Sequence, residues 1–278
     1  MNPVSTIIAI ARDVLREAAS SKLLLVLFVL IGLFLLMLVM TLNLDVVDGA
    51  LASVEIAKQG GEATTVDAMM REAFGQLAWV TFYMGLLFGI VATADVAPRA
   101  LQPGRVEHLL ALPVRRVEFV IGLYVGVCAI CAICTTTVVG GTSLVLFVKA
   151  GMVTIAPLAG AAMAFVGFCA IYAVMLAVGV FARSAALSAG AGLLTFFMGI
   201  VVGYKHRWIE LFTGAFRTGL DVLTMPIPNL VALAGVGQNA AAGAAIDLAT
   251  LAPLLAGTVA FAVVGVAVAA VIVDARDY

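Results

Sequence analysis

The sequence predicts an all-α membrane protein with six transmembrane helices. Of its 278 residues, 64% are hydrophobic and only 11% are charged, whereas a soluble domain carries about 25% charged residues. The charged residues are also absent from six long intervals, each sufficient for the ~20 residues that cross the hydrocarbon core. The net charge of −1 gives no bulk attraction to nucleic acid, so the expected partner is membrane lipid.

These charge-free intervals fix the expected spans within one transmembrane domain, residues 1–278. The spans cover residues 23–42, 77–94, 119–147, 158–180, 186–202 and 251–273. A seventh charge-free interval, from Asp221 to Asp247, contains Pro226 and Pro228. Prolines interrupt the hydrogen bonds of a helix, and lipid offers the freed backbone groups no replacement. We therefore expect a surface or re-entrant helix there.

The basic residues predict the orientation of the spans. With a cytoplasmic N-terminus, nine Lys and Arg residues lie inside and six lie outside, over longer loops. Cytoplasmic loops carry an excess of Lys and Arg. We therefore expect a multi-pass protein of the cell (inner) membrane with both termini cytoplasmic, and with residues 43–76 and 203–250 extracytoplasmic.

Residues 4–21 have the pattern of an amphipathic helix. Its apolar stripe consists of Ile7, Ile10, Ala11, Val14 and Ala18. Arg12, Asp13 and Arg16 lie on the opposite face, as in a helix that lies in the membrane interface. The alternative is a solvated extension of the first span.

Small residues are frequent in the expected spans, which indicates close helix contacts. They include Gly122 and Gly126, Gly199 and Gly203, and the run from Ser188 to Gly192. These contacts can lie within the bundle or between protomers, and the sequence leaves both open. After the fifth span, the aromatic and basic cluster from Tyr204 to Trp208 is typical of an anchor at the headgroups.

The cytoplasmic segment 95–118, between the second and third spans, contains a short expected helix. Pro103-Gly104 is a turn signal, and Pro113 must end a helix that begins near Gly104. Val106, Leu109 and Leu110 form a small apolar face. The spacing alone leaves open whether this helix docks on a partner or folds back on the bundle.

This segment resembles the cytoplasmic signature of type-2 ABC exporter permeases, including permeases of the nitrous-oxide-reductase maturation type. The matching residues are Gly104, Arg105, Val106, Glu107, Leu109, Leu110, Leu112, Pro113, Val114, Arg116, Glu118, Phe119, Gly122 and Gly126. The amphipathic start, the Pro-Asn-Leu at 228–230 and the ending Arg276-Asp277-Tyr278 are also similar to the family. Many relatives carry an acid and a Lys where this chain has Ala100 and Leu123.

The resemblance implies a coupling helix at 101–113, seated on a separate ATPase subunit. Its docking residues would be Leu101, Gly104, Arg105, Glu107, His108, Leu109, Leu112, Pro113 and Arg116. The chain has no G-x-x-x-x-G-K-[ST] motif, so ATP and Mg would bind to the partner ATPase and this chain would hold no cofactor. A second permease chain, identical or homologous, would complete the complex.

The expected function is therefore the permease subunit of an ABC exporter. The alternative is a scaffold that transmits ATP-driven motion to a periplasmic partner, which would bind the outer segments. An enzyme is not expected, because the two histidines, His108 and His206, fall on opposite sides of the membrane and no expected span contains a charged side chain.

The cysteines raise the question of a metal site. Cys128, Cys131 and Cys134 recur on one side of the third span, and Cys169 lies in the fourth. Soft thiolates bind copper(I) or zinc. Cysteine is also a small packing residue, and no His or carboxylate is expected at that depth to complete a site. We expect packing and no metal site, with these three cysteines as weak candidates.

Overall fold

The fold is that of an all-α, multi-pass membrane protein. The computed structural model describes residues 3–20, 22–41, 66–102, 115–150, 156–211, 214–224 and 226–275, and these ranges contain helices and no strand. Within these ranges, five helical segments are long and apolar enough to cross a membrane: Phe74–Ala100, Arg116–Val145, Leu158–Ala182, Ala185–Gly203 and Leu248–Asp274. The charge-free intervals predicted this class of fold.

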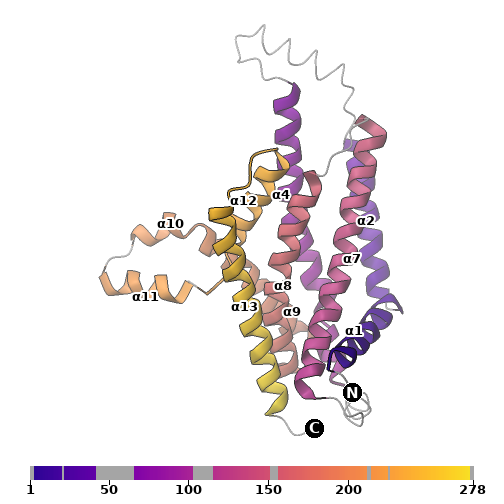
Figure 1. Cartoon of the computed structure of the whole chain (residues 1–278), viewed down its shortest axis with the longest axis vertical. Coiled ribbons are helices and arrows are strands. Elements are labelled where there is room, and N and C mark those ends of the chain that lie inside the picture. The colour runs from indigo at the N-terminus through magenta and orange to yellow at the C-terminus, as the bar shows by residue number, and fades with distance from the viewer. Residues whose placement is uncertain are drawn as a thin grey trace.

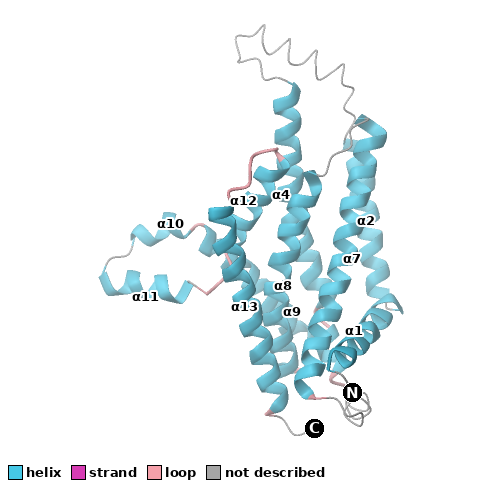
Figure 2. Cartoon of the chain, viewed as in Figure 1, coloured by secondary structure: helices cyan, strands magenta, loops and turns pink. Residues whose placement is uncertain are grey.

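The helices follow one another with few breaks (Figures 1 and 2). They are α1 (Pro3–Ser20), α2 (Lys22–Thr41), α4 (Val66–Thr93), α5 (Val96–Ala100), α7 (Arg116–Ala150), α8 (Ala156–Ala182), α9 (Ala185–Gly203), α10 (Lys205–Trp208), α11 (Gly214–Thr224), α12 (Leu230–Ala241) and α13 (Leu248–Asp274), with a 3-10 turn at Ile209–Leu211. The expected first span coincides with α2, whose described apolar part is Phe28–Met37. The count of six spans remains a prediction.

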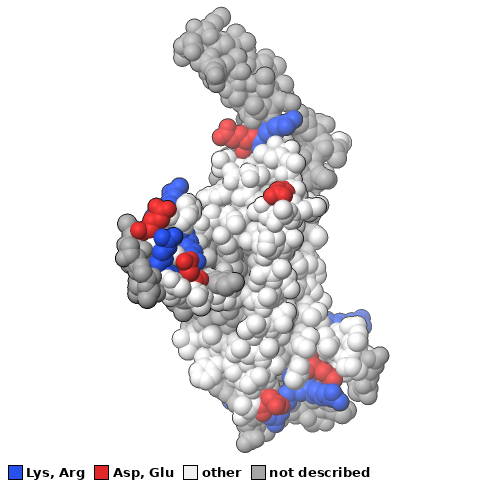
Figure 3. Space-filling view, turned by 60° about the vertical axis from the view of Figure 1, so that its left-hand side comes forward, with Lys and Arg blue, Asp and Glu red and all other residues white. Residues whose placement is uncertain are grey.

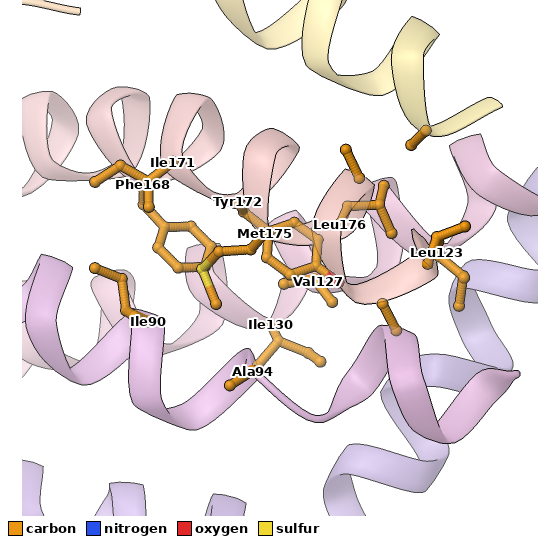
Figure 4. Packing of buried hydrophobic residues seen from close by; sticks show 14 of the residues in the cluster. Ile90, Ala94, Leu123, Val127, Ile130, Phe168, Ile171, Tyr172, Met175 and Leu176 are labelled. Carbon is orange, nitrogen blue, oxygen red and sulfur yellow. The ribbon is translucent and has the colours of Figure 1, made fainter. Parts of the chain in front are cut away.

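Helix α8 lies at the centre of the bundle and packs against α4, α7, α9, α12 and α13. Its side chains Phe168 and Tyr172 fill the space between α4 and α7 (Figure 4). The two rings stack with centroids 5.8 Å apart, and Tyr172 is fully buried. The core is thus built around one helix that the other long helices surround.

Helix α1 packs along α7 at the lower end of the bundle, which we define as the end where α1 begins and α13 ends (Figure 1). The predicted apolar stripe faces inward, since Ala11 and Val14 are buried. Gly122 and Gly126 of α7 make the close approach possible, because a Cβ at these positions would lie 2.7 Å from Ile10 and 2.8 Å from Val14. The interfacial location of α1 remains a prediction.

The connection from α8 to α9 is a tight turn. Arg183 adopts a left-handed backbone with φ of 50°, a conformation uncommon for a residue other than glycine. Ser184 then caps α9 by accepting a hydrogen bond from the Leu187 N–H, and the Ser188 hydroxyl donates to the Met175 carbonyl at 3.0 Å. The two helices therefore form a closely packed antiparallel pair.

Helix α12 occupies the stretch in which prolines argued against a lipid-facing span. Asn229 caps it by accepting a hydrogen bond from the Ala232 N–H at 2.9 Å. Leu230 and Leu233 are fully buried, and the helix packs against α4, α8 and α9. Gly199 and Gly203 admit it, since a Cβ there would lie 2.6 Å from Leu230 and 2.4 Å from Val231. Helix α12 is therefore enclosed by other helices of the bundle, and its assignment as a surface or re-entrant helix stays a prediction.

A lateral arm, made of α10, the 3-10 turn and α11, projects from the side of the bundle (Figure 1). Lys205 forms an ion pair with Asp221 that joins α10 to α11. The Trp208 indole donates a hydrogen bond to the Val201 carbonyl at 3.0 Å, and the Arg207 guanidinium lies over the Tyr204 ring. The aromatic and basic cluster therefore holds the arm against the end of α9.

Charged residues gather at the two ends of the bundle and on the lateral arm, with an uncharged surface between them (Figure 3). Helix α13 illustrates the pattern, because no charged residue occurs between Asp247 and Asp274. An uncharged belt of this kind matches the hydrocarbon core of a bilayer.

Candidate functional site

In the sequence, the candidate docking segment lies between α5 and α7. Residues 103–114 lie outside the described residues, and with them the predicted docking residues Gly104, Arg105, Glu107, His108, Leu109, Leu112 and Pro113. The two flanking members of the set, Leu101 and Arg116, are described. They show how the segment is connected to the bundle.

The residues that precede the docking segment, in α5 and at Leu101, are held in place because they are buried against the bundle. Ala97, Ala100 and Leu101 are each no more than 3% exposed, and α5 packs on α8, where Gly179 approaches Ala97 and Pro98. Asp95 and Arg99 form an ion pair one helical turn apart on the other face of α5. Leu101 is therefore part of the core and fixes the start of the segment to α8.

The trailing flank is attached to the last helix. One guanidinium nitrogen of Arg116 donates a hydrogen bond to the Asp274 carbonyl at 2.8 Å and approaches the Val273 carbonyl at 3.5 Å. These carbonyls end α13, where the helix dipole favours a cation. We call this contact the Arg116 clasp. It joins the first residue of α7 to the C-terminus of α13.

An apolar cavity of about 110 Å³ lies among α2, α4, α7 and α8. Its wall includes Phe34, Gly85, Phe88, Cys134 and Phe168. Among the described residues of this wall, the polar side chains carry hydroxyls or thiols and none is charged. The Thr93 hydroxyl donates to the Gly89 carbonyl at 2.8 Å. A cavity with this lining suits a hydrocarbon group.

The cysteines divide between two positions. Cys131 and Cys134 line the apolar cavity, whereas the Cys128 sulfur lies 3.6 Å from that of Cys169 on α8. The Tyr124 hydroxyl donates to the Cys169 carbonyl at 3.0 Å. Within the described ranges, no three His, Cys, Asp or Glu side chains come together as a metal site would require. All four cysteines are free thiols.

Sequence reasoning did not find the cavity or the pairing of Cys128 with Cys169. The three-residue spacing of the cysteines placed them on one side of a helix, but that spacing carries no information about the facing helix. A signal for the cavity was present in Gly85 and Gly89, which are one turn apart in an otherwise bulky stretch. Paired glycines at this spacing mark a helix face that leaves room for a closely packed neighbouring helix or for a cavity.

Comparisons with known proteins do not extend this picture. No protein-family model and no curated protein matches the chain.

Proposed function

We propose that this chain is the membrane-spanning permease subunit of an ABC exporter. The observation that supports the proposal most strongly is the match of residues 104–126 to the signature of type-2 exporter permeases. Its flanks, Leu101 and Arg116, belong to an all-α membrane bundle, in agreement with such a role. A separate ATPase would dock on the 101–113 segment, from the cytoplasmic side of the inner membrane.

The two anchored flanks supply a route for mechanical coupling. A displacement of the docked segment would act on α8 through α5, and on α13 through the Arg116 clasp. Since α8 packs against most of the other long helices, such a displacement would tilt the bundle as a body. Rigid-body motion of this kind is how ATP-driven closure of two partner subunits alternates the access of a bundle.

The chemistry of the apolar cavity favours a lipid-like or amphipathic cargo. The described residues of its wall include no charged side chain, and an ion or a sugar would lose its hydrogen bonds to water there without gaining others. A second permease chain, identical or homologous, would supply the other half of the path. A periplasmic partner would contact the outer segments.

The docking segment is tested by co-purification of this chain with a candidate ABC ATPase subunit. The parent chain should form a stable complex in mild detergent. Exchange of the two charges, in the double variant Arg105→Glu with Glu107→Arg, should weaken the complex because docked charges would face like charges. Arg217→Glu on the lateral arm is the control, and it should leave the complex intact. A complex that survives both the exchange and deletion of residues 106–110 would refute docking on this segment.

Export is separated from mechanical transmission by the ATPase activity of the reconstituted complex. An exporter of amphipathic cargo should hydrolyse ATP faster when candidate lipids are added to the proteoliposomes. A scaffold should respond instead to a soluble periplasmic protein and not to lipid. Stimulation by a protein partner alone would exclude the export proposal.

A further inference from the structure

A groove of about 390 Å³ lies between α1, α2 and α7, beside the middle of α7. We call it the α1 groove. Its apolar wall includes Leu15 of α1, Phe28 of α2, and Ile133 and Cys134 of α7. Two arginines of α1, Arg12 and Arg16, border the same groove. The combination of an apolar wall with two cations distinguishes it from the uncharged inner cavity.

Both arginines are exposed. Neither forms a hydrogen bond or an ion pair with the part of the chain that the structure describes. The acids of the same helix, Asp13 and Glu17, have interactions of their own. Arg12 and Arg16 are one helical turn apart, so their guanidinium groups lie on one face and repel each other. An anion between them would relieve that repulsion.

The wall of the groove belongs to the membrane-spanning part of the chain. Ile133 and Cys134 lie in α7, within the segment long and apolar enough to cross a membrane. Ile130 and Cys134 also line the inner cavity, so the groove and the cavity share two wall residues. A hydrocarbon chain that follows α7 would therefore start beside the arginines and reach the wall of the cavity.

We propose that the α1 groove binds an anionic phospholipid of the bilayer. The headgroup phosphate accepts hydrogen bonds from Arg12 and Arg16, whose guanidinium groups match a phosphate in geometry. One acyl chain lies against Leu15, Phe28 and Ile133. The assignment requires that α7 crosses the membrane and that α1 lies at the level of the headgroups, and it holds whether or not the chain is an exporter subunit.

The test measures lipid binding to the purified full chain in neutral detergent. Phosphatidylglycerol and phosphatidylcholine with identical acyl chains are titrated separately, and native mass spectrometry counts the bound lipids. The parent should prefer phosphatidylglycerol. The double variant Arg12→Gln with Arg16→Gln should bind it about thirtyfold more weakly, as expected for two interfacial arginines, and should retain its weaker binding of phosphatidylcholine.

A matched control removes the same charge elsewhere. Arg115→Gln with Arg217→Gln changes two exposed arginines outside the groove and should leave the preference unchanged. A second variant, Ile133→Trp, fills the groove from a side chain that is 48% exposed. It should reduce phosphatidylglycerol binding with both arginines intact, while circular dichroism shows the same helix content as the parent.

Two outcomes would overturn the proposal. In the first, the Arg12 and Arg16 variant binds phosphatidylglycerol as tightly as the parent does. In the second, inorganic phosphate alone displaces the lipid and raises the thermal midpoint by the same amount, which would make the pair of arginines a site for free anions.

Discussion

Gly85 and Gly89 lie one turn apart on α4 and both line the inner cavity, yet their surroundings differ. A Cβ at Gly89 would lie 2.7 Å from two ring carbons of Phe168, whereas a Cβ at Gly85 would meet nothing within 4 Å. The two positions therefore give the same substitution two different expected effects.

We expect Gly89→Ala to destabilise the protein by about 1–3 kcal/mol, because the Phe168 ring must move in a packed core. Gly85→Ala should be neutral or stabilise by up to about 1 kcal/mol, since alanine is the better helix former. Unfolding in mixed detergent micelles, followed by circular dichroism, measures both. Equal losses of stability in the two variants would contradict this difference in packing between Gly85 and Gly89.

Asp247 caps α13, and its hydrogen bonds should make the stability of the protein depend on pH. The Thr250 hydroxyl and the Ala249 N–H donate hydrogen bonds to its carboxylate, which lower the pKa of Asp247 below its usual value. A lowered pKa stabilises the fold above the pKa of the unfolded chain, and that contribution is lost as the pH falls through the folded value.

We therefore expect the thermal midpoint of the parent to exceed that of Asp247→Ala at neutral pH. The difference should shrink as the pH falls below about 4, where the carboxyl group takes up a proton. Thermal scans of both proteins in detergent from about pH 7 to about pH 3 measure it. A difference that stays constant over this range would mean that the charge of Asp247 plays no part in the cap.

At the scale of elements, the Arg116 clasp is the polar contact that fastens α7 to α13 at the lower end. Arg116→Gln should weaken the end of α13 by about 1 kcal/mol, because a charge near the last carbonyls is replaced by a neutral amide. Arg116→Lys keeps the charge and should recover part of the loss. Hydrogen exchange of the last turn of α13 reports the effect. Exchange rates equal to those of the parent in Arg116→Gln would exclude the clasp as a cap.

The structure shows which helices meet at the close contacts that the sequence predicted. The small residues predicted contact faces but left open whether these lie inside one chain. Gly122 and Gly126 face α1, and Gly199 and Gly203 face α12, so both pairs serve contacts within the chain. A glycine pair indicates that another helix packs closely at that face. Which helix this is depends on contacts between residues far apart in the sequence.

At the scale of the whole molecule, the predicted orientation is open to a direct test. The turn between α8 and α9 and the connection between α12 and α13 lie at opposite ends of the bundle (Figure 1). A fluorescent-protein fusion after residue 183 should be active, since that turn is expected in the cytoplasm. An alkaline phosphatase fusion after residue 244 should be active because it is expected outside. If neither of these fusions is active and the two exchanged fusions are, the protein has the opposite orientation.

The class of fold could be predicted because composition and charge-free length are local properties of the sequence. The neighbours of α12 could not be predicted, since Pro226 and Pro228 argued against a lipid-facing span without indicating which helices would enclose it. The burial of Leu101 was likewise hidden, because the pattern that suggested a docking residue also fits a core residue. The cavity depends on four helices at once, and no single stretch encodes it.

The central place of α8 also bears on the order in which the protein is made. Three of its neighbours, α9, α12 and α13, follow it in the chain, so they leave the ribosome after α8 has entered the membrane. Until then the alanine- and glycine-rich faces of α8 are covered by lipid tails, which pack less closely on small side chains than a helix does. Synthesis that stops before α13 thus leaves the side of α8 that faces α13 without its partner helix.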